Sequence, residues 1–267
     1  MLTQSTIGDS RPIGVFDSGL GGVSVLRALC AHLPSEDFVY FGDSANAPYG
    51  VKTQDQILDL SRQATKRLLA FDVKAIVIAC NTATAASAEC LRTEYPHLPI
   101  LGVEPAIRPA ALSSKHPKVL IMATPMTLKM DKFKTLERSL SPLAEFYTLP
   151  CPGLVELIEQ GPERSAQLRE FLSRLLAPIL ASPPDAVVLG CTHYPFILPL
   201  LKELFPSTTA FFDGAEGTAK QLEKRLAEQN LLAPCTHRGC VRFLSSSTDP
   251  QTTALMESFF RSHPFSS

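Results

Sequence analysis

The sequence predicts an α/β protein made of two similar parallel-sheet α/β domains that face a central cleft. Short apolar runs recur along the chain and alternate with longer segments of helical periodicity. Several runs are continuously apolar rather than alternating, as in parallel strands that are covered on both faces. Two of these runs end in a cysteine that is followed by small polar residues. This repetition indicates that the chain contains two related halves.

The expected elements follow in order along the chain. Three segments with apolar positions at helical spacing lie between the runs, at residues 54–71, 168–180 and 216–229, and Asp213 and Gly214 provide an N-cap region for the last. Regular alternation of strand and helix predicts parallel sheets. The runs expected as strands are residues 13–16, 37–42, 75–80, 99–103, 118–123, 144–149, 186–191 and 209–214.

The repeat also suggests where the domains divide. The run at residues 13–16 and the run at residues 118–123 each end in small polar residues, and each is followed further on by a cysteine run. We therefore expect a first domain of residues 1–103 and 214–267, with a C-terminal segment that returns to it, and a second domain of residues 104–213. Ligands of such α/β pairs bind where the carboxyl ends of strands face a cleft.

Composition narrows the classes of function. The chain has 267 residues, 45% hydrophobic and 19% charged, with a net charge of −1. This composition suits a globular protein with a buried core. The charge balance shows no basic excess for nucleic acid or an anionic membrane surface. The first residues lack a secretory signal, and no run approaches a membrane span. We expect a cytoplasmic protein whose seven cysteines are reduced.

The two cysteine runs carry the main chemical signal. Cys80 ends the run in KAIVIAC and precedes NTATA, and Cys191 ends the run in AVVLGC and precedes THYP. A lone cysteine at a strand end is usually a small buried apolar residue. The second copy instead favours two thiols presented to one cleft. A helix that begins directly after each strand is expected to lower the pKa of its thiol.

Two further strand ends offer polar groups. In IGVFDSGLGG, the glycines do not match a dinucleotide-binding loop, and a strand-to-helix turn explains them, while Asp17 and Ser18 fall at the end of the run. In YFGDSANAPYG, Asp43 either caps the loop or contacts a ligand, and Tyr49 and Gly50 offer a hydroxyl and a backbone N–H.

The remaining cysteines carry less signal. Cys235, His237 and Cys240 lie close in sequence but lack the fourth ligand and the spacing of a zinc site, so no metal is expected. The other three, which do not end an apolar run, are expected to be packing residues: Cys30, Cys90 and Cys151.

Taken in order, FDSGLGG, YFGDSANAPYG, ACNTATA and GCTHYP resemble the glutamate racemases over about residues 13–217. The resemblance implies interconversion of L- and D-glutamate without a cofactor or a metal, by proton transfer to and from two cysteines. It also implies a supply of D-glutamate for peptidoglycan and a homodimer that binds glutamate but neither nucleic acid nor membrane.

The resemblance assigns roles residue by residue. Cys80 and Cys191 would be the acid/base thiols, with Asp17 assisting near Cys80 and His193 near Cys191. The family's acidic residue after CPGLV falls on Glu159, with Glu156 as the rival position. The substrate contacts that it implies are Asp17, Ser18, Tyr49, Gly50, Asn81, Thr82, Thr124, Thr127, Thr192 and His193.

Three alternative functions remain from the sequence. A racemase of aspartate or another amino acid would differ only in the length of its pocket. A cysteine hydrolase could use Cys191 and His193 and would leave Cys80 unexplained. An amino-acid-binding module would bind glutamate without exchanging a proton.

Overall fold

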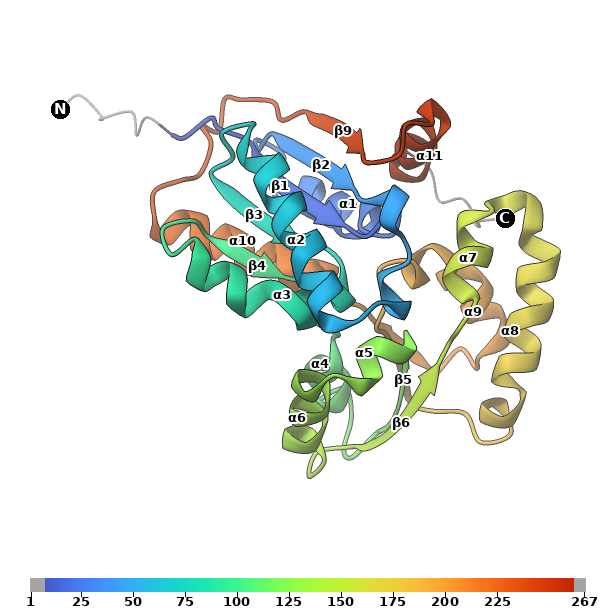
Figure 1. Ribbon diagram of the computed structural model, residues 1–267. Helices are drawn as coiled ribbons and strands as arrows, with labels where there is room; N and C mark the ends of the chain where they lie inside the picture. Colours follow the sequence, from blue (N-terminus) through green and yellow to red (C-terminus); the bar gives the residue numbers. More distant parts are fainter. Residues whose placement is uncertain (1–7, 262–267) are drawn as a thin grey trace.

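The computed structural model describes residues 8–261, and it contains two separate sheets of parallel strands (Figure 1). The first sheet has the order β4-β3-β1-β2-β9, and the second has the order β6-β5-β7-β8. The predicted class of two parallel-sheet α/β halves is confirmed. The strands are β1 (Ile13–Asp17), β2 (Phe38–Gly42), β3 (Ala75–Ile78), β4 (Ile100–Gly102), β5 (Lys118–Ala123), β6 (Glu145–Pro150), β7 (Ala186–Leu189), β8 (Ala210–Phe212) and β9 (Val241–Ser245).

The two sheets repeat one topology. In the first sheet, β1 lies between β2 and β3, and β4 extends the sheet beyond β3. In the second, β5 lies between β6 and β7, and β8 extends the sheet beyond β7. All these pairs are parallel, so within each sheet the carboxyl ends of the strands meet at one edge. The loops that follow β3 and β7 therefore occupy equivalent positions in the two halves.

Helices cover both sheets (Figure 1). The predicted helix at residues 54–71 ends two residues earlier, and Thr53 and Gln56 fix its start with a reciprocal capping box. The helices are α1 (Val23–His32), α2 (Gln54–Leu69), α3 (Asn81–Glu94), α4 (Ile107–Ala111), α5 (Pro125–Lys129), α6 (Asp131–Leu140), α7 (Leu154–Glu159), α8 (Ser165–Leu180), α9 (Leu198–Leu204), α10 (Ala215–Glu228) and α11 (Pro250–Arg261).

The C-terminal segment returns to the first sheet, as the repeat suggested. Helix α10 packs on α1, and β9 pairs in parallel with β2 at the edge of the sheet. Strand β9 was not among the expected strands, because its residues are only partly buried and no long apolar run marks it. The domain boundaries at residues 103/104 and 213/214 stay a prediction.

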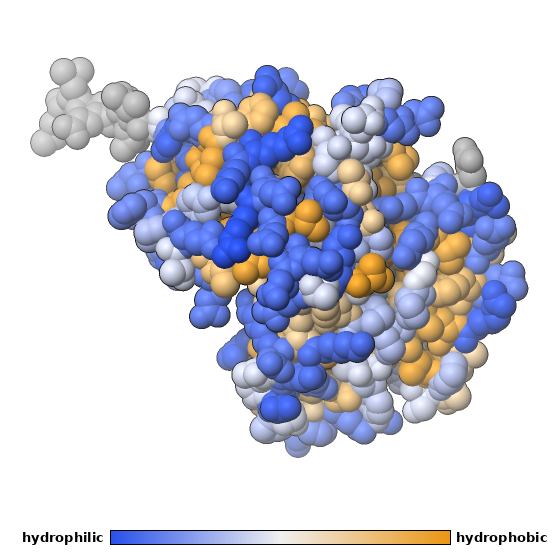
Figure 2. Space-filling view, viewed as in Figure 1, coloured by the Kyte–Doolittle hydropathy of each residue, from blue (hydrophilic) through white to orange (hydrophobic). Residues whose placement is uncertain are grey.

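The core joins the two halves. One cluster of buried hydrophobic side chains contains residues of both sheets, among them Val15, Val77, Leu120 and Val187. Hydrophilic side chains cover most of the face shown in Figure 2, and hydrophobic ones appear between them in several places, including the α8 side at the right. Within residues 8–261, no helix is both long enough and apolar enough to cross a membrane.

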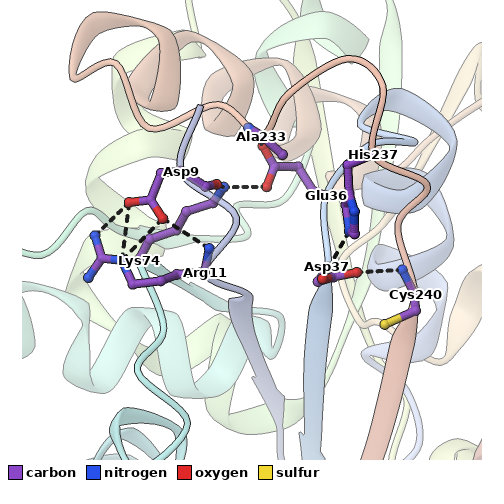
Figure 3. Close-up of polar contacts among 8 residues, drawn as sticks. All are labelled: Asp9, Arg11, Glu36, Asp37, Lys74, Ala233, His237 and Cys240. Carbon is purple, nitrogen blue, oxygen red and sulfur yellow. Dashed lines mark hydrogen bonds and ion pairs between the residues drawn. The ribbon is translucent and has the colours of Figure 1, made fainter. Parts of the chain in front are cut away.

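A buried ion pair ties the chain together near the amino ends of the strands in the first sheet (Figure 3). Lys74 Nζ lies 2.5 Å from Glu36 Oε2, and the two residues are 1% and 3% exposed. Lys74 also donates to the carbonyl of Asp9, and the backbone N–H of Ala233 donates to Glu36 Oε1 over 2.8 Å. The pair thus links segments that precede β1, β2, β3 and β9.

Replacing Lys74 with methionine should lower the free energy of unfolding by about 3–5 kcal/mol, because it leaves the Glu36 carboxylate buried without its cation. Urea unfolding would measure the loss. The matched control is Arg62→Met, which removes an exposed ion pair of 2.7 Å to Glu94 and should cost at most about 1 kcal/mol. Equal losses in the two variants would show that the buried pair has no special weight.

Candidate active site

Cys80 and Cys191 follow β3 and β7, the equivalent strands of the two sheets. Each lies two residues beyond the last residue of its strand, and both are buried. Both line a single cavity of about 220 Å³. The two strand-end thiols therefore meet in one cavity that receives residues from both halves of the chain.

Helix α3 begins directly after Cys80. The thiol is the N-cap of this helix, and its sulfur accepts a hydrogen bond from the backbone N–H of Ala83 over 3.4 Å. On its other side, the Cys80 thiol donates to the Ser18 hydroxyl over 3.6 Å. Cys80 was expected to end β3, but the strand stops at Ile78 because the chain turns there to start α3.

The expectation that helix position lowers the pKa of the thiol is wrong for Cys80. Burial and the nearby Asp17 carboxylate raise the pKa of Cys80 to about 12, and the N–H of Ala83 and the Ser18 hydroxyl only partly offset them. Desolvation disfavours the charged thiolate more than the weak bonds to sulfur favour it. At neutral pH, Cys80 therefore carries its proton when the cavity holds no ligand.

The surroundings of Cys191 are different. His193 Nδ1 lies 3.8 Å from the Cys191 sulfur, and His193 Nε2 lies 2.8 Å from Glu159 Oε1. Burial alone would lower the pKa of His193, but Cys191 and the Glu159 carboxylate raise it well above its usual value. The hydrogen bond from His193 in turn lowers the pKa of Glu159, against the effect of burial. The two ring nitrogens of His193 thus join the Cys191 sulfur to the Glu159 carboxylate.

Asp17 links the loop after β1 to the second half. It is fully buried, and it accepts hydrogen bonds from the Gly19 backbone N–H over 2.9 Å and from the Thr192 hydroxyl over 3.3 Å. Burial raises the pKa of Asp17, although His193 and the backbone donors oppose the shift. The Ser24 hydroxyl also donates to the Thr192 carbonyl over 2.7 Å. The start of α1 thus holds the Cys191 loop.

Three threonine hydroxyls from both halves meet beside the cavity. Thr82 lies in the first turn of α3. Thr124 is the N-cap of α5, and Thr127 lies in the first turn of that helix. The Oγ1 atoms are 3.3 Å apart for Thr82 and Thr124, 3.2 Å for Thr82 and Thr127, and 2.9 Å for Thr124 and Thr127. Hydroxyls that donate only to one another can turn to donate to a carboxylate.

The cavity brings together most of the residues that the sequence singled out, but not all of them. Asp17 lies behind Ser18, Thr127 lies behind the other two threonines, and Glu159 reaches the site through His193, so none of these three forms its wall. The predicted residues that do line it are Ser18, Tyr49, Gly50, Cys80, Asn81, Thr82, Thr124, Cys191, Thr192 and His193.

Two acidic residues of α7 lie on different sides of the site. Glu156, the rival of Glu159, lines the cavity with an exposed side chain, whereas Glu159 contacts His193. Glu156 thus lies at the cavity wall and Glu159 lies beside His193. The sequence alone could not tell which of them contacts the site, because both belong to the same short helix.

Sequence reasoning missed Cys151, which also lines the cavity. Its thiol is 2% exposed and donates to the Leu149 carbonyl over 3.3 Å, and burial raises its pKa to about 12. Cys151 is indeed packed, but it directly follows β6, so it has the strand-end position that it was thought to lack. The sequence feature that could have drawn attention to Cys151 is the pair of prolines, Pro150 and Pro152, on either side of it.

The cavity offers a small amino acid mainly hydroxyl, amide and backbone groups. Among the described residues that line it, none is lysine or arginine. Asn81 is 7% exposed and lines the cavity, and its Oδ1 is buried without a hydrogen-bond partner. A buried acceptor of this kind is costly unless a donor reaches it. With two cysteine side chains in its wall, the cavity can move protons to and from a bound carbon.

Other candidate sites lack this chemistry. His237 Nε2 lies 3.0 Å from Asp37 Oδ2, and the Cys240 backbone N–H donates to Asp37 Oδ1 over 2.7 Å (Figure 3). Residues 8–261 contain no group of three or more histidine, cysteine or acidic side chains placed to hold a metal ion. A larger cavity of about 1060 Å³ lies where β4, α4 and α10 meet, and neither cysteine nor histidine lines it.

Comparison with known proteins agrees with this geometry. Residues 13–222 match the family model described as Asp/Glu/Hydantoin racemase. The glutamate racemase of Clostridium novyi is 46% identical over 235 residues, which cover 88% of this chain and 91% of that protein. The structure is also similar to two crystal structures of glutamate racemases.

The first is the Francisella tularensis enzyme in complex with D-glutamate, with a TM-score of 0.81, 30% identity and 95% of each chain covered. The second is the Escherichia coli enzyme in complex with L-glutamate and the activator UDP-MurNAc-ala, with a TM-score of 0.81, 28% identity and 96% of each chain covered. The family resemblance seen in the sequence motifs is confirmed.

Proposed function

Because this chain belongs to the Asp/Glu/hydantoin racemase family, we propose that it interconverts L- and D-glutamate by proton transfer between two thiols and the α-carbon. The observation that carries the proposal is the meeting of Cys80 and Cys191 in one cavity from equivalent strand ends of two similar sheets. Racemisation removes a proton from one face of a carbon and delivers another to the opposite face. Two fixed groups do this without any turn of the substrate.

The two thiols have different hydrogen-bond partners. We propose that Cys191, whose sulfur faces the His193 ring held by Glu159, acts first as the base, whereas the raised pKa of Cys80 keeps its proton on sulfur. Cys191 then takes the α-proton of one enantiomer, and the Cys80 thiol donates its proton to the other face. The products are a Cys191 thiol, a Cys80 thiolate and the opposite enantiomer. The family implies that Cys191 serves L-glutamate and Cys80 serves D-glutamate.

The remaining residues stabilise the charge that forms. We propose that the hydroxyls of Thr82 and Thr124 and the backbone N–H of Gly50 bind the substrate carboxylates, while Thr127 orients the other two threonines and Thr192 stays bonded to Asp17. Asn81 Oδ1 and Ser18 then accept from the α-ammonium group. Donors fixed before the reaction stabilise a developing carbanion without having to reorganise. Asp17 holds Thr192 and the glycine turn by hydrogen bonds, and its carboxylate lies near the Cys80 thiol that it would assist.

The wider setting is also part of the proposal. We propose that the protein acts in the cytoplasm as a homodimer and supplies D-glutamate for peptidoglycan. We further propose that residues 1–103 with 214–267, and residues 104–213, are the two domains whose facing edges form the cavity.

The direct test is incubation of purified protein with L-glutamate in deuterated water, without added cofactor. Circular dichroism should decay to zero while proton NMR shows deuterium entering the α-carbon, and Cys90→Ser, an exposed cysteine on α3, should behave like the unchanged protein. Aspartate in a parallel sample tests the shorter substrate, and a burst of product from an ester would reveal a hydrolase. Folded protein that neither exchanges nor racemises glutamate would refute the proposed function.

A further inference from the structure

The loop after β2 contains a buried carboxylate that the proposed chemistry does not use. Asp43 is 4% exposed, and its backbone N–H donates to the carbonyl of Asp17 over 2.9 Å. Its Oδ2 accepts from the Tyr49 hydroxyl over 2.7 Å, and Asn46 Nδ2 donates to Oδ1 over 2.9 Å. A buried carboxylate needs such donors, because loss of water otherwise costs several kcal/mol. Asp43 does not line the cavity.

Tyr49 connects this carboxylate to the cavity. The side chain is 1% exposed, and the residue lines the cavity wall. Its phenol proton is donated to Asp43, so this hydroxyl does not offer the substrate a free proton, contrary to the sequence expectation. Burial raises the pKa of Tyr49, and the bond to Asp43 and the nearby Cys80 add to the shift. The phenol therefore stays protonated and keeps its bond to Asp43 throughout the neutral pH range.

The residues after Tyr49 reach the second half of the molecule. Tyr49–Val51 form one turn of 3₁₀ helix that packs on α5. A Cβ atom added at Gly50 would lie 3.3 Å from Thr124 Cβ, so the two residues are in close contact. Thr124 carries one of the three clustered hydroxyls. The position of the Tyr49–Val51 turn thus sets one wall of the cavity and its contact with the opposite half.

We propose that Asp43 is a positioning residue that holds the Tyr49–Val51 turn against Thr124 through the Tyr49 hydroxyl. Asn46 fixes the other carboxylate oxygen and so orients the group. This inference rests on the proposed function for its kinetic consequence, because the wall that Asp43 positions is the wall that glutamate would contact. Its structural part, the tethering of residues 44–52, does not depend on the reaction.

The test uses Tyr49→Phe, Asp43→Ala and the double variant, with Tyr95→Phe and Asp59→Ala as matched controls outside the cavity. Tyr49→Phe removes one hydroxyl and keeps the packed ring, so it remains informative if Asp43→Ala does not fold. We expect Tyr49→Phe to raise KM for glutamate about tenfold and to change kcat less, because a hydrogen bond to a charged group is lost while the thiols stay in place. The double variant should resemble the worse single one, since both changes break the same contact.

Hydrogen exchange of residues 44–52, followed by mass spectrometry without substrate, gives the second measurement. Exchange should be faster in Tyr49→Phe and Asp43→Ala than in the parent and the controls. Unchanged exchange, or kinetic losses that multiply in the double variant, would overturn the positioning role. Faster exchange in a protein that does not racemise glutamate would support the tether and refute only the proposed function.

Discussion

Cys80→Ser and Cys191→Ser should each lower the kcat of racemisation about a thousandfold, in both directions of the reaction. A serine hydroxyl has nearly the same size as a thiol, but it is a far weaker acid and cannot act as the base at neutral pH. Since each turnover needs one base and one acid on opposite faces of the carbon, either substitution stops the full reaction. Polarimetry or circular dichroism, started from each enantiomer in turn, would measure the loss.

The control for these variants is the set of cysteines that lie outside the cavity. Cys90→Ser and Cys235→Ser change exposed thiols and should leave kcat unchanged. If either Cys80→Ser or Cys191→Ser turned over glutamate at a near-normal rate while remaining folded, the two-thiol mechanism would be untenable.

Gly21→Ala should lower kcat/KM on the order of a hundredfold, the usual scale for misplacing a catalytic group by about 1 Å. A Cβ atom at Gly21 would lie 2.3 Å from His193 Nδ1 and 2.5 Å from Thr192 Oγ1. Both side chains are buried and held by hydrogen bonds, His193 to Glu159 and Thr192 to Asp17, so a shift of either one breaks a contact of the site. The added methyl group would therefore displace His193 from the Cys191 sulfur, or push α1 away from the second half.

Gly217→Ala is the matched control, since a Cβ atom there would meet no atom within 4 Å and the residue lies in α10. This substitution should keep activity and add slightly to stability. A racemisation assay together with thermal unfolding separates the two effects. Full activity in Gly21→Ala would mean that close packing of α1 on the Cys191 loop is unimportant for the reaction.

Much of the fold could be predicted because local patterns carry it. Apolar runs, several of them continuous, marked eight strands, and the repeated cysteine at the end of two runs predicted that Cys80 and Cys191 would meet. Strand β9 was missed, because Arg242 interrupts its short apolar stretch and none of its residues is fully buried. The exposed edge strand β6 was predicted all the same, so edge position alone does not hide a strand.

The details of the site depended on contacts between distant segments. The pKa of Cys80 is raised by burial and by Asp17, which lies on another strand, so the expected effect of the helix start did not decide it. The direction of the Tyr49 hydroxyl depends on Asp43 and was likewise beyond local reasoning. Glu159 was placed by the family resemblance, and its contact with His193 joins residues 34 positions apart.

The unequal surroundings of the two thiols have a kinetic consequence. Enantiomers have the same free energy in water, so the equilibrium constant of a racemase is unity. The Haldane relation then requires kcat/KM to be equal for L- and D-glutamate, however different the His193 and Ser18 sides are. Any asymmetry between the halves can therefore change kcat and KM only in the same proportion. The enantiomer with the higher KM must also have the higher kcat.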